Sequence, residues 1–157
     1  MAANDSYFMS EAIKLAWMAY CEGEVPVGAV ITKNNNIIAV GRNRRETKKN
    51  ALFHAEIEAI NNACNVLNGW RLWECELFVT LEPCLMCAGA IINSRIKRVV
   101  FGAKDLKFGS CGSVINLFEE NYNHKPEIKS GILKEECAQL LINFFKKVRS
   151  KNNYLVS

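Results

Sequence analysis

Three long segments of the chain place apolar residues at helical spacing. Residues 6–21 have this pattern and predict an amphipathic helix that ends near Gly23. Residues 133–151 predict a long amphipathic helix toward the other end of the chain. Between them, a helix is predicted to begin near Ala55, because the apolar residues that follow recur at helical spacing: Ile57, Ile60, Ala63, Cys64 and Leu67.

Shorter apolar runs alternate with these helices and predict strands. The predicted strands are residues 25–32, 37–42, 76–80, 96–102 and 127–132, with a short helix near 115–118. The first two flank the turn-rich tetrad 33–36 and form a hairpin. This order predicts an α/β fold with three α/β/α layers, in which a five-stranded mixed sheet carries helices on both faces. In such sheets, ligands bind where strand ends lead into helix N-termini.

The composition indicates a globular protein with a sizeable core. At 157 residues and 50% hydrophobic content, the chain is expected to form a single domain over residues 1–157. It contains no apolar run of 18 residues, and the first six residues lack the features of a secretory signal. The seven cysteines are an odd number without disulfide-like spacing, which is typical of a reducing compartment. We therefore expect a soluble, cytoplasmic protein with no membrane partner.

The formal net charge is only +4, but the basic residues are clustered. The clusters lie within residues 42–49, 95–98, 104–107 and 146–151. Any one of them is typical of a solvated surface. Together they suit a substrate with several phosphates, because each neutralised phosphate adds affinity that does not depend on sequence. This distribution favours a substrate that carries several phosphates, and we expect no DNA partner.

Two short motifs supply the residues of a catalytic zinc site. The first is His54-Ala55-Glu56, and the second contains Pro83, Cys84 and Cys87. Catalytic zinc takes three protein ligands and keeps a fourth position for water, whose pKa falls to roughly 7. His54, Cys84 and Cys87 are the predicted ligands of one Zn²⁺ per chain. Glu56 is the predicted catalytic residue, a carboxylate that moves protons without binding the metal.

The spacing of these residues is compatible with helix geometry. Residues i and i+3 share one face of a helix, so Cys84 and Cys87 can point at one ion if Pro83 lies just ahead of the first turn. His54 and Glu56 are two residues apart and point in different directions within a regular helix. They converge only if the helix begins between them.

Other interpretations of the motifs stay open at this point. A lone Cys-x-x-Cys pair also occurs in thioredoxin-like redox proteins. A structural zinc site, or a zinc-stabilised binding module without activity, needs a fourth protein ligand. The remaining candidates form no second close pair in the sequence: Cys21, Cys64, Cys75, Cys111, Cys137 and His124.

The chain resembles the bacterial tRNA-specific adenosine deaminases of the TadA type, within the cytidine-deaminase-like superfamily, along nearly its whole length. Besides the zinc motifs, the resemblance is carried by residues 24–30, 70–72, 79–90, 94–96, 99–105, 131–133 and 144–146. Residues 50–53 depart from the Asp-Pro-Thr-like turn that many members have before the zinc histidine. Free guanine and cytosine deaminases share the zinc motifs, and residues 108–113 also resemble the catalytic subunit of a eukaryotic-type heterodimer. These remain the alternatives.

The resemblance implies hydrolytic deamination of adenosine to inosine at the wobble position, 34, of a tRNA anticodon loop, by a homodimer. The adenine leaves its stack, and Glu56 transfers protons to ring N1 and to the departing ammonia. By the same resemblance, the Asn43 side chain and the Ala55 backbone bind the base, Val27 packs on it, and Asp105 holds a neighbouring ribose hydroxyl. The remaining expected substrate contacts are Lys107, Phe145, Lys146 and Arg149.

Overall fold

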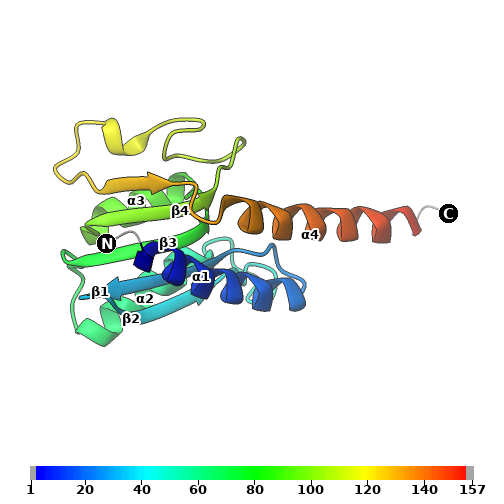
Figure 1. The fold of residues 1–157 in the computed structure, drawn as a ribbon, viewed down its shortest axis with the longest axis horizontal. Coiled ribbons are helices and arrows are strands. Elements are labelled where there is room, and N and C mark those ends of the chain that lie inside the picture. The colour runs from blue at the N-terminus through cyan, green and yellow to red at the C-terminus, as the bar shows by residue number, and fades with distance from the viewer. Residues whose placement is uncertain (1–2, 155–157) are drawn as a thin grey trace.

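A five-stranded mixed sheet lies between helices in the computed structural model, which describes residues 3–154 (Figure 1). The elements are α1 (Ala3–Cys21), β1 (Gly28–Lys33), β2 (Asn36–Arg42), α2 (Ala55–Leu67), β3 (Cys75–Leu81), α3 (Leu85–Ser94), β4 (Arg98–Ala103), the 3₁₀ helix η1 (Leu117–Glu119), β5 (Glu127–Ser130) and α4 (Lys134–Tyr154). The strand order is β2-β1-β3-β4-β5. β1 is antiparallel to both neighbours, whereas β3, β4 and β5 are parallel.

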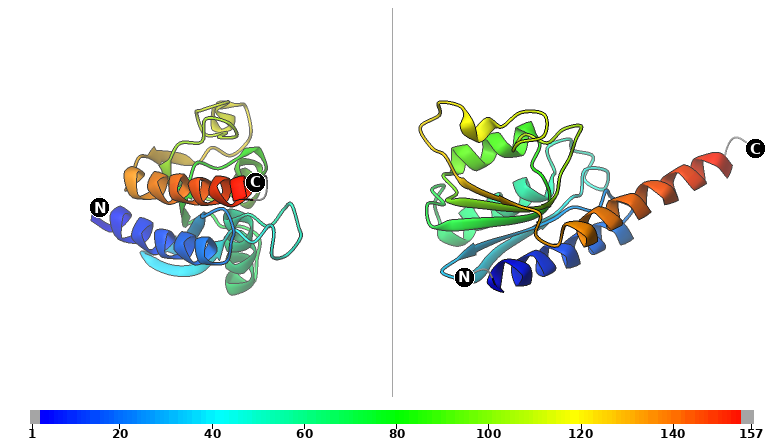
Figure 2. Two further views of the ribbon diagram at one scale, coloured as in Figure 1. Left: turned by 90° about the vertical axis from the view of Figure 1, so that its right-hand side faces the viewer. Right: turned by 45° about the horizontal axis from the view of Figure 1, so that its top comes forward.

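The central strands are buried on both faces, and alternate residues serve two separate cores. Ala29, Leu77 and Val99 belong to a cluster with α2, α3 and η1. Val30 and Phe78, each one residue further along its strand, belong to a second cluster with α1 and α4. Figure 2 shows the same division, with α1 and α4 together on one side of the sheet. The predicted three-layer α/β/α architecture with its five-stranded mixed sheet is confirmed.

The predicted hairpin is present, but its boundaries differ from those expected. β1 begins at Gly28 rather than at Val25. Pro26 has no N–H to donate, and the Val27 N–H donates to the Val25 carbonyl (2.9 Å), so this segment turns before pairing starts. The turn itself is shorter than the predicted tetrad, because Asn34 and Asn35 alone adopt positive φ values of 51° and 60°. Two such residues form the tight turn that suits strand twist.

The other boundaries differ from the prediction by a few residues. The short helix lies at Leu117–Glu119, because the Asn116 side chain accepts a hydrogen bond from the Phe118 N–H and caps it there. α1 begins at Ala3 and α4 continues to Tyr154, so both helices are longer than predicted. None of the helices within residues 3–154 combines the length and the apolar composition that a bilayer crossing requires.

Two glycines allow helices to lie directly on the hairpin. A Cβ atom at Gly28 would overlap the Ala12 carbonyl oxygen and the Ala16 nitrogen of α1. A Cβ atom at Gly41 would overlap the Ala55 carbonyl oxygen at the start of α2. The seating of both helices therefore depends on the absence of a side chain at these strand positions.

We expect Gly28→Ala to lower the free energy of unfolding by about 1 to 3 kcal/mol, because α1 must move away from β1 to accommodate the methyl group. Gly89→Ala is the matched control. A Cβ at Gly89, within α3, meets no atom within 4 Å beyond its chain neighbours and the backbone of its own helix, so alanine there should be neutral or stabilise the helix. Urea unfolding of both variants checks this, and equal midpoints would contradict the predicted contact.

Candidate active site

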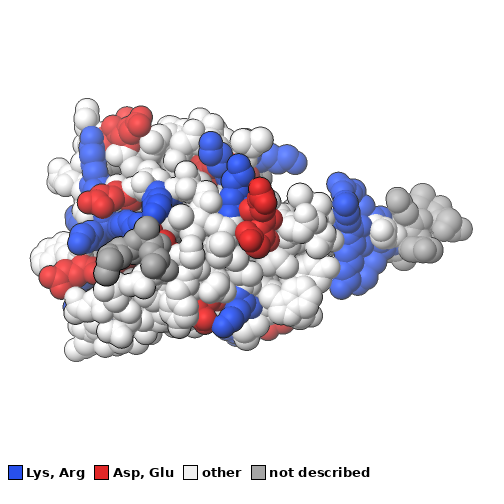
Figure 3. All heavy atoms as spheres, in the orientation of Figure 1, with Lys and Arg blue, Asp and Glu red and all other residues white. Residues whose placement is uncertain are grey.

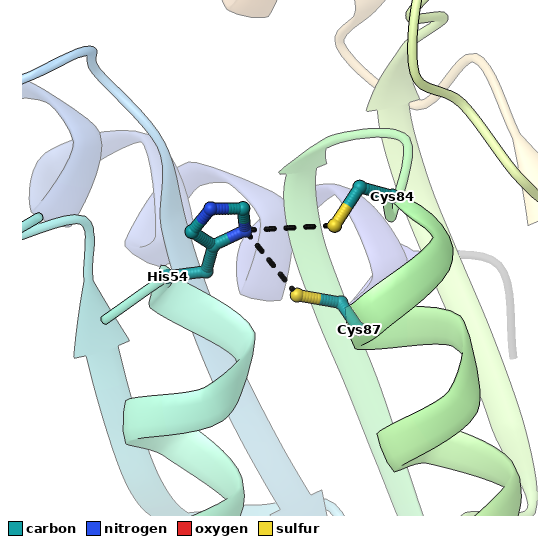
Figure 4. A group of neighbouring side chains, drawn as sticks. All are labelled: His54, Cys84 and Cys87. Carbon is teal, nitrogen blue, oxygen red and sulfur yellow. Dashed lines mark hydrogen bonds between the residues drawn. The ribbon is translucent and has the colours of Figure 1, made fainter. Parts of the chain in front are cut away.

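Two helices begin beside each other on one face of the sheet, and each begins at a residue of the predicted metal group (Figure 4). His54 is the N-cap of α2 (φ −79°, ψ 157°), and Cys84 is the N-cap of α3 (φ −75°, ψ 177°). Neither side chain caps its own helix. Cys87 lies three residues into α3 and points toward the same place. The sequence had suggested that Cys84 lies within the first turn of the helix, but Cys84 precedes the helix.

The three side chains form a compact group of potential metal ligands. The His54 Nδ1 atom lies 3.6 Å from the Cys84 Sγ and 3.5 Å from the Cys87 Sγ. All three candidate ligand atoms are within 4.8 Å of one another. Cys87 is fully buried, while His54 and Cys84 are half-buried. An imidazole and two thiolates in this arrangement could hold one metal ion.

The group already favours the thiolate that a metal ion requires. The pKa of the Cys84 thiol falls to about 4, chiefly because the Cys87 side chain donates a hydrogen bond to the thiolate. The same shared proton raises the pKa of Cys87, and burial raises it further. The hydrogen bond with Cys84 raises the pKa of His54. Position at a helix N-terminus also favours a negatively charged sulfur.

Glu56 lies beside this group but is not a member of it. It occupies the first turn of α2, with only 4% of its surface exposed. Burial is the main cause of its raised carboxyl pKa, whereas a hydrogen bond with the Cys87 side chain lowers that pKa. A buried carboxyl group of this kind can carry a proton. The helix does begin between His54 and Glu56, as their convergence requires.

The predicted base-binding residues are neighbours in the structure. Val27 precedes β1, Asn43 follows β2, and the Asn43 N–H donates to the Val27 carbonyl (3.0 Å). The Asn43 side chain donates to the Val25 carbonyl (3.1 Å) and is 7% exposed. Ala55 is fully buried at the start of α2. Their roles toward a substrate stay predictions.

Asp105 and Lys107 lie on a loop, residues 104–116, that packs against the cysteine end of the site. Gly109 of this loop forms a β-bridge with Cys84. The Asp105 Oδ1 atom accepts the N–H groups of Lys107 (3.1 Å) and Phe108 (3.2 Å). Lys107 is exposed, whereas Asp105 is half-buried. Asp105 follows β4 and Asn43 follows β2, and these two strands flank β1 and β3 in the sheet.

The expected contacts on α4 lie elsewhere. Phe145, Lys146 and Arg149 are exposed on α4. The C-terminal part of this helix projects beyond the sheet (Figure 1). Figure 3 shows Lys and Arg side chains gathered near the projecting end. The structure therefore does not bring these residues into the His54 group. They form a separate basic surface.

The unusual entry segment before His54 is a turn organised by Asn50. Its side-chain oxygen accepts the Leu52 N–H (2.9 Å), and its carbonyl accepts the Phe53 N–H (3.1 Å). Phe53 is half-buried, and Leu52 is 59% exposed. An Asn side chain commonly forms this type of turn, so the segment needs no proline to hold its shape.

Two buried carboxylates that the sequence analysis did not single out hold the loops around the site. Glu24 is fully buried and accepts the N–H groups of Glu46 and Thr47, each at 2.9 Å. Glu82 is 2% exposed and accepts hydrogen bonds from the loop that carries Asp105. The available signal in the sequence was that each glutamate stands next to an otherwise apolar strand segment, which contains no partner for its charge.

Comparisons with known proteins agree with this geometry. Residues 3–149 match the family model described as MafB19-like deaminase. The tRNA-specific adenosine deaminase of Bacillus subtilis (strain 168) is 50% identical over 149 residues, which are 94% of this chain and 92% of that protein. A solved structure from a study of A-to-I editing by tRNA:A34 deaminases has a TM-score of 0.84 and 40% identity, covering 86% of this chain and 99% of that one.

The fold also occurs with another substrate. A guanine deaminase from Nitrosomonas europaea has a TM-score of 0.78 but only 24% identity, with 88% of this chain and 83% of that chain covered. This likeness concerns the fold alone. The identity that extends over nearly the whole of the bacterial relatives is much higher, and the chain belongs to the tRNA-specific adenosine deaminase family of deaminase enzymes.

Proposed function

We propose that this protein uses zinc to convert adenosine to inosine at wobble position 34 of a tRNA anticodon loop. The observation that carries the chemistry is a three-ligand group, His54, Cys84 and Cys87, next to a buried carboxylate outside that group. The observation that carries the substrate is the 50% identity to a tRNA-specific adenosine deaminase.

The ligand distances support zinc as the metal. A tetrahedral zinc ion with Zn–N bonds of about 2.0 Å and Zn–S bonds of about 2.3 Å separates the nitrogen from each sulfur by roughly 3.5 Å. The His54 Nδ1 atom lies 3.6 Å and 3.5 Å from the two sulfur atoms. Both nitrogen–sulfur distances match that separation. When bound, zinc supplies a Lewis acid that makes water a nucleophile at neutral pH.

Glu56 carries the protons in this proposal. It removes one proton from the attacking water and delivers it to ring N1, which activates C6 for addition. It then passes the second proton to the departing amino group, so that water and adenosine become inosine and ammonia. Its burial keeps bulk water away from the carboxyl group. Val27, Asn43 and the Ala55 backbone bind the base that has left its stack, and Asp105 binds a neighbouring ribose hydroxyl.

The basic surface of α4 is proposed to bind the RNA backbone. Lys146, Lys147 and Arg149 are exposed there, and Phe145 is 46% exposed beside them. Side chains of both kinds suit single-stranded RNA, because phosphates need cations and unstacked bases need aromatic surfaces. Lys107 adds a cation near the metal group. A small free base would need none of these residues.

We further propose a cytoplasmic homodimer. Large apolar side chains are exposed next to the site, and contact with a second copy would cover them: Leu85 (63%), Leu106 (81%) and Phe108 (69%). The reducing compartment fits the cysteine content, since all seven cysteines are free thiols in the structure.

The zinc assignment predicts a selective loss of metal. Wild-type protein should contain one zinc per chain by elemental analysis, and Cys87→Ala should lose it, because two ligands do not hold zinc tightly. Cys137→Ala is the matched control, since Cys137 is also a buried thiol but packs with α1 on the other face of the sheet. Equal zinc contents in the two variants would contradict the assignment.

The substrate assignment predicts a specific product. Wild-type protein should form inosine at position 34 of an anticodon stem–loop and leave free guanine and free cytosine unchanged. Glu56→Ala should slow single-turnover deamination by about 10² to 10⁴, roughly 3 to 5 kcal/mol, while zinc and stem–loop binding persist. Glu58→Gln, on the same helix but paired with Arg44, should retain the rate. Ammonia release from free guanine would instead support the alternative function.

The RNA surface predicts a change in salt dependence. Replacing Lys146, Lys147 and Arg149 by alanine should weaken stem–loop binding and reduce its log–log salt slope by roughly one unit per lost phosphate contact at most. Replacing Lys33, Lys97 and Lys125 removes the same charge at the strand ends that lie away from the metal group. Lys33 pairs there with Cys75, the first residue of β3. That control should leave the slope nearly unchanged. Identical slopes for the two variants would mean that α4 does not bind RNA.

A further inference from the structure

Glu82 is a buried carboxylate whose partners all belong to one loop. Its Oε1 atom accepts the Asp105 N–H (3.2 Å) and the Ser113 hydroxyl. Its Oε2 atom accepts the N–H groups of Cys111 (3.1 Å) and Ser113 (3.1 Å). Within the described part of the chain, no Lys or Arg lies at ion-pair distance from it. Four donors from residues 105–113 therefore take the place of a cation.

This arrangement fixes the loop. A carboxylate without partners is costly to bury, and hydrogen bonds to an ionised acceptor are stronger than neutral ones. If residues 105–113 moved away, the Glu82 carboxylate would lose all four of these hydrogen bonds. The loop and the carboxylate hold each other in place, and the loop has one preferred position.

The loop sits directly on the cysteine end of the site. The Ser110 N–H donates to the Pro83 carbonyl (2.9 Å), and Gly109 forms a β-bridge with Cys84. A Cβ atom at Gly109 would overlap the Glu82 carboxylate and the Asp105 carbonyl oxygen. The close approach between Glu82 and the loop therefore requires glycine at this position.

We propose that Glu82 is a positioning residue for substrate binding, because it holds Asp105 at the edge of the metal group. The inference rests on the proposed function, in which Asp105 binds a ribose hydroxyl of the substrate. Glu82 fixes the Asp105 backbone through the N–H group. The Asp105 Oδ1 atom is then fixed by the Lys107 and Phe108 N–H groups. Glu82 itself touches neither substrate nor metal.

The chemistry of glutamine makes Glu82→Gln a selective test. With its carbonyl oxygen at the Oε2 position, glutamine still accepts the Cys111 and Ser113 N–H groups. Its NH₂ group at the Oε1 position can donate to the Ser113 hydroxyl, but it cannot accept the Asp105 N–H. The variant therefore removes the hydrogen bond to Asp105 and keeps the rest of the loop attached.

The experiment measures kcat, KM and zinc content for the wild type, E82Q, D105A and the double variant with an adenosine-34 stem–loop. E82Q should raise KM about 10-fold, with kcat and zinc content within about twofold of wild type. In the D105A background, E82Q should add no further rise in KM, because it acts through Asp105. Gly109→Ala places a methyl group against the Glu82 carboxylate, so it should displace the loop and raise KM in the same way.

E24Q is the matched control. Glu24 is also a buried carboxylate that accepts two backbone N–H groups, but from the loop that precedes His54. Its effect on KM should multiply with that of D105A. If E82Q and D105A multiply as well, or if E82Q loses zinc and kcat while KM stays constant, the positioning role is wrong.

Amide hydrogen exchange separates this inference from the proposed function. Exchange at the Asp105 amide should be faster in E82Q than in the wild type or in E24Q. Exchange that E82Q does not accelerate would overturn the positioning by Glu82. A wild-type protein that leaves the stem–loop unchanged would overturn the proposed function, and with it the role of Asp105 toward a substrate.

Discussion

The active site depends on two helices that start at the same place on one face of the sheet. Serine, threonine, aspartate and asparagine are the usual N-cap residues, because their side chains accept a free backbone N–H. Here the N-caps are His54 and Cys84, and neither makes such a bond. Each helix gives up roughly 1 kcal/mol of capping stabilisation at that position. The side chains released in this way face each other and form the metal group.

Packing against the sheet supplies the stabilisation that the helix caps do not. Gly41 lets the first turn of α2 lie directly on β2, and β3 leads through Pro83 into α3. Burial of the helix faces against the sheet fixes both starts, so ligand geometry is set by packing rather than by capping. Glu56 and Cys87 occupy the first turns of their helices, so the same packing positions them.

Sequence patterns reveal the helices and strands but not what holds the loops. The periodicity of apolar residues predicted α2 near Ala55, and the motif spacing predicted the metal group, because both are local properties of the chain. The roles of Glu24 and Glu82 are not local. Glu82 accepts hydrogen bonds from residues 23 to 31 positions away. No pattern within a single strand or helix predicts these bonds.

The same distinction explains the errors at element boundaries. Asn34 and Asn35 shorten the predicted turn because both accept positive φ, a property of two residues rather than of the turn-rich tetrad around them. η1 is displaced to Leu117–Glu119 because one side chain, Asn116, caps it. Apolar periodicity averages over many residues, so it locates an element without locating the single interaction that ends it.

The distribution of charge matters more than the net charge, because exposed charges interact only over short distances. Screening limits the interaction between exposed charges to about 8 to 10 Å at physiological salt. The basic residues of α4 and those around the metal group lie in different parts of the molecule, so each cluster sets its own local potential. A net charge of +4 over 157 residues therefore describes neither surface. An extended phosphate backbone can contact the surface of α4 and the surroundings of the metal group at once, whereas a free base can occupy only the metal group. The projecting helix therefore favours a polynucleotide substrate.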